Sequence, residues 1–599
     1  MTEGTASVER VREELRQLGY LDTGIDRFAL GGAGGDSPLK ACARVAARLG
    51  PAGGILFGAA FSAAAALLEP DRLRDPADLA VLFIYVCVAA TLATSALALL
   101  AGLLAGWLGR RLGHRPGPRL SRNVGLALGA LGAAYLGLWW RSHALGAPAG
   151  VQAALAVTAL GLVLALTRFG SLAAIAVLAA GGAAERLPEA RDARRHMARL
   201  VAVAVLVLAA AAAAASRLGE VEDVGPDYAV RPTGLRIRVI GVDGLDGGLA
   251  LSMAARGEMP ELARRLPLAA RARLRPEPEP VPAIVWTTVA TGRGPEAHGV
   301  RGVGTRLAGM KAPVSFPSAL AGAADVLRIT RTEPPSAVLR SVKAFWNVAS
   351  DKGLRVGVVN WWATWPAEPL NGYVVSDRAF LKVELGGPPD REVYPEEDFA
   401  TVKALLPPAP DRARRRDLFH AAAAARLREE RPVDLEAVYL PGLDIFVNQQ
   451  MSAAPAGDLG ALDARLGTIR EYYRFLDRLL GEMTARLTPD DVVVLVGDPG
   501  RFERGATSGL LMIWGGPARA ADLGTVSERD IAPTILHLVG LPVSRELPGT
   551  VLTAALQPSF NESHAVEHVA RYARRRAAPA ASGFDREMIE ELRSLGYIH

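Results

Sequence analysis

The sequence has little cysteine and little charge for its length. Among its 599 residues there are two cysteines; Cys42 precedes the first apolar run and Cys87 lies inside the second. No disulfide or cysteine-based zinc site is therefore expected in the remainder of the chain. Charged residues make up 22% of the chain and hydrophobic residues 50%, and the mean hydropathy is +0.19. This balance excludes a disordered chain and a simple water-soluble protein.

The N-terminus lacks the apolar core of a signal peptide. The segment TEGTASVERVREELRQLGY is polar and charged, so we expect no cleavable signal and any export depends on internal helices. The net charge is +6, and arginine greatly outnumbers lysine. Much of this excess lies in short loops between apolar runs, where arginine orients membrane helices and does not indicate nucleic-acid binding. Abundant alanine and arginine also favour a bacterial source with a GC-rich genome.

Five apolar segments are long enough, or nearly long enough, to cross a bilayer as helices. They are Pro51–Leu68, Leu79–Trp107, Val124–Trp140, Val151–Ala184 and Leu200–Ser216. The fourth is either one long, kinked or partly re-entrant element or a tight hairpin that turns near Arg168-Phe169-Gly170. Arginine-rich loops precede the first segment, follow the second and precede the last, which favours a single crossing by the fourth. We therefore predict five crossings, with the N-terminus inside and the C-terminal part outside.

Composition and hydrophobic periodicity divide the chain into five predicted parts. They are a polar segment 1–49, a transmembrane region 50–216, a linker 217–234, a domain 235–558 and a helical tail 559–599. In the domain, apolar strands alternate with helical stretches, which predicts an α/β fold with a largely parallel sheet. The polar segment contains a helical pattern at Val8–Leu18. Its string VREELRQLGYL is echoed near the C-terminus by IEELRSLGYI, either as two helices with the same cap or as a shared docking element.

Three aspartates end apolar strands of the predicted sheet. Asp243 follows LRIRVIGV, Asp444 ends LEAVYLPGLD and Asp498 ends DVVVLVGD. An aspartate after a strand is commonly a turn residue or a helix cap. Because the carboxyl ends of parallel strands meet at one edge of a sheet, we expect the three side chains to converge there.

Seven strings occur in the order typical of one protein family. They are VIGVDGLD (Val239–Asp246), WTTVATGRGPEAHGV (Trp286–Val300), FWNVASDKGLRVGVVNWWATWPAEPLNGYVVSD (Phe345–Asp377), VYLPGLD (Val438–Asp444), VVVLVGDPG (Val492–Gly500), GLLMIWGGPA (Gly509–Ala518) and IAPTILHLVGLP (Ile531–Pro542). The chain from Leu235 to Leu556 resembles the alkaline phosphatase superfamily, in its type I phosphodiesterase/nucleotide pyrophosphatase branch. The resemblance implies an alkaline-phosphatase-like α/β fold, two zinc-like ions and a Ser or Thr nucleophile.

The sequence departs from this family at the positions that carry the chemistry. The nucleophile position is occupied by Pro282, which has no hydroxyl. The positions of three histidine ligands are occupied by Asn448, Pro499 and Ala506. The metal and nucleophile set is therefore degenerate, although the framework strings are intact.

The residual metal ligands implied by the resemblance are the three aspartates, with Asn448 as a further oxygen donor. Oxygen-only ligands favour Mg²⁺ or Ca²⁺ over zinc, so a divalent cation is the one cofactor considered. Without a cation, three converging carboxylates would raise one another's pKa, unless Arg501 or Arg504 neutralises them. The sequence does not choose between these alternatives.

Other candidate side chains have ordinary structural explanations. His298 belongs to the family's usual His-Gly turn, and His537 lies in a helix that we expect to be packed. Thr287 and Thr288 are hydroxyls near the expected nucleophile, but a helix that starts near Trp286 would point them elsewhere.

Two histidines and three tryptophans are the remaining candidate side chains. His564 and His568 have the spacing of a metal-chelating pair on a helix, but their arginine-rich tail favours a surface helix. Trp361, Trp362 and Trp365 follow a predicted strand. They either pack in the core or, where exposed, offer a stacking surface for sugar or base ligands.

Two functions are compatible with these residues. The first is a catalytically degenerate protein that acts in ligand binding or scaffolding at the bacterial envelope, and the second is a metal-dependent phosphoester hydrolase or phospho-head-group transferase with rearranged ligands. We favour the first, because no residue replaces the nucleophile. The expected partners are the lipid bilayer and a phosphorylated, lipid or glycan ligand, without nucleic acid. The expected location is the bacterial plasma membrane, with the C-terminal domain outside.

Overall fold

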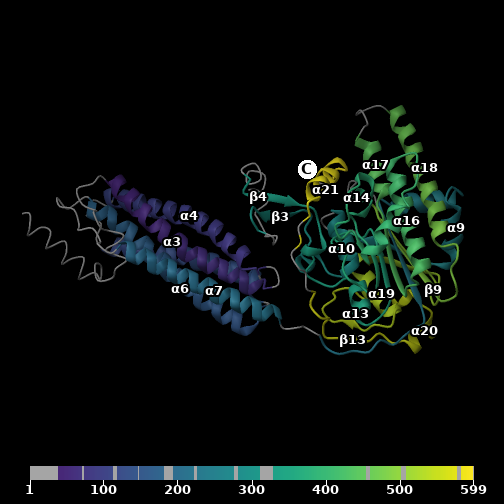
Figure 1. The fold of residues 1–599 in the computed structure, drawn as a ribbon, viewed down its shortest axis with the longest axis horizontal. Coiled ribbons are helices and arrows are strands. Elements are labelled where there is room, and N and C mark those ends of the chain that lie inside the picture. Colours follow the sequence, from purple (N-terminus) through teal and green to yellow (C-terminus); the bar gives the residue numbers. More distant parts are fainter. Residues whose placement is uncertain are drawn as a thin grey trace, which may run out of the picture. The chain divides into compact units, whose positions relative to one another are not determined.

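The computed structural model divides the chain into two compact units, Met1–Glu222 and Asp223–His599 (Figure 1). The residues that it describes are 38–70, 73, 75–111, 118–145, 147–180, 193–220, 225–275, 281–310, 328–452, 459–500, 508–575, 580 and 582–597. The helical pattern predicted at Val8–Leu18 lies outside these ranges.

Five long apolar helices form the described part of the first unit. They are α3 (Pro38–Leu68), α4 (Pro76–Arg111), α5 (Pro118–His143), α6 (Ala149–Ala180) and α7 (Ala193–Glu220). Proline occupies the first position of three of them, where its missing N–H would have no helical partner. By length and composition, all five are able to cross a membrane. Helix α6 continues through Arg168 without a turn, so the fourth predicted segment is one helix and the hairpin alternative is wrong.

Small residues bring the first two helices close together. A Cβ atom at Gly54 would lie 2.7 Å from the carbonyl oxygen of Cys87 in α4, and one at Gly58 would lie 2.9 Å from the Cα of Cys87. Glycines four residues apart share one face of a helix and let two backbones approach closely. The spacing of Gly54 and Gly58 in α3 therefore permits the close contact between α3 and α4.

A nine-stranded sheet forms the centre of the second unit, in the order β11-β2-β10-β9-β1-β8-β5-β6-β7. The strands are β1 (Arg236–Asp243), β2 (Ala270–Arg275), β5 (Val356–Val359), β6 (Gly372–Val375), β7 (Val393–Tyr394), β8 (Leu435–Leu440), β9 (Asp491–Asp498), β10 (Gly509–Gly515) and β11 (Ala521–Ser527). Strands β9, β1, β8, β5 and β6 run parallel, and β10 and β7 pair antiparallel to their neighbours. This arrangement confirms the predicted α/β class with a largely parallel sheet. Two short sheets pair β3 (Gly304–Leu307) with β4 (Thr330–Glu333) and β12 (Val543–Ser544) with β13 (His568–Val569).

The central strands bury apolar side chains on both faces of the sheet. In β1, Ile237 and Val239 belong to one core, and Ile240 and Val242 belong to the other. The first core includes residues of α10 (Pro282–Thr291), α13 (Phe345–Asp351), α19 (Ile531–Leu538) and α21 (Asp585–Ser594). The second includes residues of α8 (Gly247–Ala255), α9 (Pro260–Arg265), α14 (Ala379–Leu385), α15 (Phe399–Lys403), α16 (Arg412–Glu430), α17 (Gly442–Ser452) and α18 (Leu459–Met483). Figure 1 shows helices of both sets, such as α13, α16 and α19, beside the sheet, as near-continuous apolar strands require.

The C-terminal segment packs against the body of this unit. Glu591 of α21 accepts hydrogen bonds from Arg412 at 2.8 Å and from Arg416 at 2.6 Å. After α21, the ring of Tyr597 meets the ring of Trp362 edge-on at 5.6 Å. Helix α21 and its Leu-Gly-Tyr end are therefore anchored to α16 and to the loop after β5.

Candidate functional site

Two of the three predicted aspartates end neighbouring parallel strands. Asp243 ends β1 and Asp498 ends β9, and the two residues are register partners in the sheet. Both side chains are buried. Each strand is followed by a turn that contains a glycine in the left-handed region, Gly244 at φ 79° and Gly500 at φ 80°. The sequence therefore brings these two carboxylates to one edge of the sheet, as predicted.

The third aspartate lies at the same place but in a different element. Strand β8 ends at Leu440, and Asp444 lies in the first turn of α17, so the prediction that Asp444 ends a strand is wrong. A Cβ atom at Gly244 would lie 2.6 Å from the Cα of Asp444, and one at Gly500 would lie 2.8 Å from its Oδ1. The two glycine turns thus close directly on Asp444. A carboxylate in the first turn of a helix is stabilised by the helix dipole, which accounts for its position.

The buried position of the Asp498 carboxyl group disfavours its ionised form. Burial raises the pKa of Asp498 to about 7, and the neighbouring Asp444 carboxylate also raises it. The backbone N–H of Gly500 donates to Oδ2 of Asp498 at 2.9 Å and opposes this shift. The two carboxylates therefore lie close enough to repel one another in a buried position.

The carboxylate of Asp243 accepts a hydrogen bond from an aromatic side chain. The hydroxyl of Tyr439 in β8 donates to Oδ2 of Asp243 at 2.6 Å, and the indole N–H of Trp362 donates to the Tyr439 oxygen at 2.9 Å. Burial raises the pKa of Tyr439 well above its ordinary value, and Asp243 raises it further. Tyr439 therefore keeps its proton and remains a donor to Asp243.

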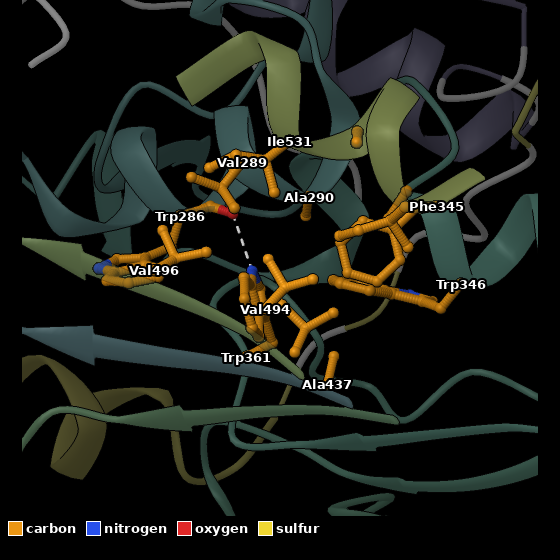
Figure 2. Close-up of a cluster of buried hydrophobic side chains, with 14 of the residues drawn as sticks. Trp286, Val289, Ala290, Phe345, Trp346, Trp361, Ala437, Val494, Val496 and Ile531 are labelled. Carbon is orange, nitrogen blue, oxygen red and sulfur yellow. Dashed lines mark hydrogen bonds between the residues drawn. The ribbon is translucent and has the colours of Figure 1, made fainter. Parts of the chain in front are cut away.

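The tryptophan cluster after β5 is part of the core. Trp361, Trp362 and Trp365 are all buried, so they do not offer an exposed stacking surface. Trp361 donates its indole N–H to the carbonyl oxygen of Trp286 at 2.8 Å, and the two rings meet edge-on at 5.5 Å (Figure 2). The alternative in which these residues pack in the core is the correct one.

The helix beneath the expected nucleophile begins earlier than predicted. Helix α10 starts at Pro282, with Val281 as its N-cap residue, whereas the sequence predicted a start near Trp286. Pro282 is buried at the first helical position, where its fixed φ suits the helix. The side chain at the expected nucleophile position is therefore a pyrrolidine ring in a helix start.

The nearby hydroxyls and the imidazole are buried within the protein. Thr288 Oγ1 lies 3.3 Å from Nε2 of His298, and Nδ1 of His298 accepts from the N–H of Val300 at 3.1 Å. Burial lowers the pKa of His298 to about 3, and Arg340 lowers it further. Thr287 is also buried in α10. His298 is a neutral structural residue, as the sequence predicted.

The three positions expected to supply histidine ligands to a two-zinc site hold Asn448, Pro499 and Ala506 instead. Asn448 donates its side-chain N–H to the carbonyl oxygen of Leu595 at 3.2 Å, and Pro499 offers no side-chain donor atom. Ala506, Arg501 and Arg504 lie outside the residues that the structure describes. Over the described ranges, no group of three or more His, Cys, Asp or Glu side chains is arranged to hold a metal ion. The residues present therefore do not fit the two-zinc centre of the family.

The remaining histidines lie away from the aspartates in the fold. His537 is buried in α19, as predicted. His564 follows α20 (Pro558–Ser563), and His568 lies in β13. The prediction of one surface helix across these two residues is therefore wrong, because β13 pairs with β12 and extends the chain there.

Sequence reasoning missed Tyr439 and its contact with Asp243. A signal was present, because Gly241 interrupts the apolar run of β1 and is the register partner of Tyr439. A Cβ atom at Gly241 would lie 2.5 Å from the ring of Trp286, whose centroid is 4.8 Å from that of Tyr439. A glycine inside a buried strand commonly marks such a close approach.

The strand order, the two covered faces and the polar ends of β1 and β9 define an α/β domain with the alkaline phosphatase fold. The sequence pattern of the family described as "Type I phosphodiesterase / nucleotide pyrophosphatase" matches residues 238–501. Over this range the chain is similar to that family. No curated protein matches the sequence.

The solved structures that match the chain include two hydrolases. A phosphonoacetate hydrolase from Sinorhizobium meliloti, in complex with phosphonoformate, has 16% identity and a TM-score of 0.28, with 46% of this chain and 60% of that chain covered. A phosphonate monoester hydrolase from Silicibacter pomeroyi has 15% identity and a TM-score of 0.33, with 54% and 76% covered. An alkaline phosphatase superfamily protein from Vibrio parahaemolyticus has 12% identity and a TM-score of 0.32, with 54% and 71% covered. The chain thus spans about three fifths of the length of the phosphonoacetate hydrolase.

Proposed function

We propose that the chain is a membrane-anchored, catalytically degenerate member of the type I phosphodiesterase family that acts in ligand binding or scaffolding at the bacterial envelope. In this proposal the helices of the first unit span the plasma membrane and the second unit lies on the outer side. The phosphodiesterase-like domain keeps the family's framework but does not transfer phosphoryl groups.

The observation that carries this proposal is the state of Asp243. Its carboxylate accepts a 2.6 Å hydrogen bond from Tyr439, which is itself oriented by Trp362. This bond engages Oδ2 of Asp243 with a side chain of the protein. Pro282 supports the same conclusion, because a pyrrolidine ring has no atom that attacks phosphorus.

The proposal is tested by activity measurements on the detergent-purified full chain. We expect hydrolysis of bis(p-nitrophenyl) phosphate and p-nitrophenyl phosphate at the rate of the Asp498→Asn variant, which serves as the background. Loss of a nucleophile typically costs several orders of magnitude, and the residual rate comes from the surrounding electrostatics. Pro282→Thr alone should not restore activity, because the ligands of the activating cation would still be missing. Turnover by the wild type that Asp498→Asn abolishes would contradict the proposal.

Metal content gives an independent test. Asn448 and Pro499 replace histidine ligands, so we expect elemental analysis to find no stoichiometric pair of zinc ions in protein purified without chelator. Two zinc ions per chain would contradict the assignment of these positions. Weak binding of Mg²⁺ or Ca²⁺ that Asp243→Asn abolishes would be compatible with an oxygen-only site.

A second function is favoured by the pair formed by Asp444 and Asp498. A buried carboxylate such as Asp498, whose pKa is raised by burial and by a neighbouring carboxylate, is typical of catalytic sites as well as of structural networks. On this alternative, the domain is a phosphoester hydrolase or phospho-head-group transferase with rearranged ligands. The activity measurement above distinguishes the two functions, since only the alternative predicts turnover that depends on Asp498.

A further inference from the structure

A pocket lined by four arginines lies at the edge of the sheet opposite the aspartates. It has a volume of about 150 Å³ and lies where β1, β8 and β9 begin. Strand β1 runs from Arg236 in the pocket to Asp243, which separates the two places by about 23 Å at 3.3 Å per residue. The pocket, here called the arginine pocket, is therefore distinct from the candidate site.

The lining of the arginine pocket carries an excess of positive charge. The charged residues that line it are Arg236, Arg238, Arg428, Arg486, Glu436 and Asp491. Four cations and two anions leave a net charge of +2. The cations come from three places in the fold: β1, α16 and the turn before β9.

Both acids are already engaged by protein groups. Asp491 accepts from Nε of Arg236 at 3.2 Å and from the hydroxyl of Thr488 at 2.8 Å. Glu436 has a side chain that is 2% exposed and accepts from the hydroxyl of Tyr373 at 2.6 Å. Asp491 and Glu436 are therefore held by these partners, and the lining keeps its excess positive charge.

The buried Glu436 is shared between two guanidinium groups. Arg428 donates to its Oε2, and Nε of Arg238 lies 3.8 Å from the same oxygen. Burial lowers the pKa of Arg238, and the neighbouring Arg428 lowers it further. Arg486 is the most accessible cation; its side chain is 93% exposed and lies 4.0 Å from its nearest acid, Glu429. The Glu436 carboxylate is thus shared by Arg428 and Arg238, and the guanidinium group of Arg486 is exposed to solvent.

The size of the arginine pocket restricts what it holds. A volume of 150 Å³ accommodates several waters or one small oxyanion, since a water needs about 10–15 Å³ on this measure. It is smaller than the roughly 300–1,000 Å³ typical of pockets for drug-sized molecules. Guanidinium groups match the geometry of phosphate oxygens and bind them with two parallel hydrogen bonds.

We propose that the arginine pocket binds a small multivalent oxyanion of the phosphate type, with Arg428 and Arg486 as its accessible ligands and Arg238 as the buried one. The phosphate group belongs either to free inorganic phosphate or to the head group of a phosphomonoester lipid. The proposal does not depend on whether the aspartate edge is catalytic.

The test measures phosphate binding to the full chain in detergent by isothermal titration calorimetry at pH 7.5. Ionic strength is held constant with chloride, so that general screening does not change along the titration. We expect saturable binding of inorganic phosphate to the wild type and at least tenfold weaker binding to Arg428→Gln and to Arg486→Gln. Arg486 is almost fully exposed, so its variant keeps the test informative even if Arg428→Gln disturbs the fold.

Two matched controls separate this site from general charge effects and from the aspartates. Arg426 lies on the same helix as Arg428 but pairs with Glu430 at 2.6 Å and does not line the pocket. Arg426→Gln and Asp498→Asn should both bind phosphate as the wild type does. Binding that Arg426→Gln weakens as much as Arg428→Gln, or no saturable binding to the wild type, would overturn the proposal.

A second titration identifies the source of the phosphate group. Short-chain phosphatidic acid carries the same monoester phosphate on a lipid. Tighter binding of this lipid than of inorganic phosphate, again lost in Arg428→Gln, would support the pocket as a lipid head-group site. Equal or weaker binding of the lipid would support free phosphate, and failure of both ligands to bind would overturn the proposal.

Discussion

Some buried carboxylates of the second unit accept hydrogen bonds from donors of the protein. Asp417 accepts from the N–H of Gly442 at 2.9 Å and from the hydroxyl of Tyr472 at 3.0 Å. Asp243 accepts from Tyr439 in the same way. Donors reduce the cost of burying an acid but do not remove it, because burial still raises the pKa of Asp417 to about 7. Such an acid makes folding stability depend on pH.

The first residue-scale prediction concerns Asp417. An ordinary aspartate has a pKa of about 3.9, so between about pH 4 and 7 the unfolded chain has released a proton that the folded chain keeps. Stability therefore falls as pH rises through this window. In Asp417→Asn this contribution disappears, and we expect the variant to gain stability relative to the wild type from pH 5 to pH 8, measured by thermal unfolding in detergent.

A matched control for this prediction is Glu396→Gln, which replaces an exposed acid. This variant changes the net charge by the same amount as Asp417→Asn. It should follow the pH profile of the wild type. A stability difference between wild type and Asp417→Asn that stays constant from pH 5 to pH 8 would contradict the prediction, since no proton would then be linked to folding at this site.

A second residue-scale prediction concerns Tyr439. Removing its hydroxyl takes a donor from the buried carboxylate of Asp243, which costs about 1–3 kcal/mol. We expect Tyr439→Phe to be destabilised by this amount in denaturant unfolding. In an Asp243→Asn background the same substitution should cost less, because the neutral amide is less costly to leave without its partner. Equal costs in the two backgrounds would show that the hydrogen bond contributes nothing specific.

At the scale of elements, the sequence predicted what depends on local pattern. The continuous apolar run of Val492–Leu495 predicts a buried strand, and the spacing and length of the five apolar segments predict their helices. The convergence of Asp243 and Asp498 follows from strand direction alone. These properties need no knowledge of distant contacts.

Other features were missed, either because a local signal was overlooked or because they depend on tertiary context. The start of α10 is set by Pro282, which the sequence argument treated as a lost nucleophile and not as a helix start. The extended chain at His568 exists because β13 pairs with β12, some 25 residues earlier in the chain. Tyr439 meets Asp243 because of the register between β8 and β1, which no local pattern specifies.

The element-scale prediction concerns the contact between α3 and α4. A side chain at Gly58 would meet the backbone of Cys87, so Gly58→Val should force the helices apart at a cost of about 1–3 kcal/mol. We expect faster maleimide labelling of Cys87 in detergent, measured in a Cys42→Ala background. Gly161→Val in α6 is the control, because nothing lies within 4 Å of the Cβ position there. Equal labelling in both variants would contradict close packing at Gly58.

At the scale of the whole molecule, the described residues that precede the phosphodiesterase-like unit form five apolar helices. An odd number of crossings places the two ends of the helical region on opposite sides of a membrane. The charge of the loops then selects the direction: 69–78 contains four acids and two arginines, whereas 108–123 and 185–199 are rich in arginine. Positive loops remain in the cytoplasm. The side on which the second unit works therefore depends on residues far from it in the sequence.

The last prediction tests this topology with reporter fusions in a bacterial host. A phosphatase reporter that is active only outside the cytoplasm should be active after Glu69 and after Arg217, and inactive after Arg119 and after Arg195. A fluorescent reporter that folds only inside should give the opposite pattern. Replacing the arginines at 110, 111, 115 and 119 by alanine should weaken this preference, since they hold the second loop inside. A cytoplasmic result after Arg217 in the unaltered chain would mean that one of the five helices does not cross, and the second unit would then meet cytoplasmic ligands.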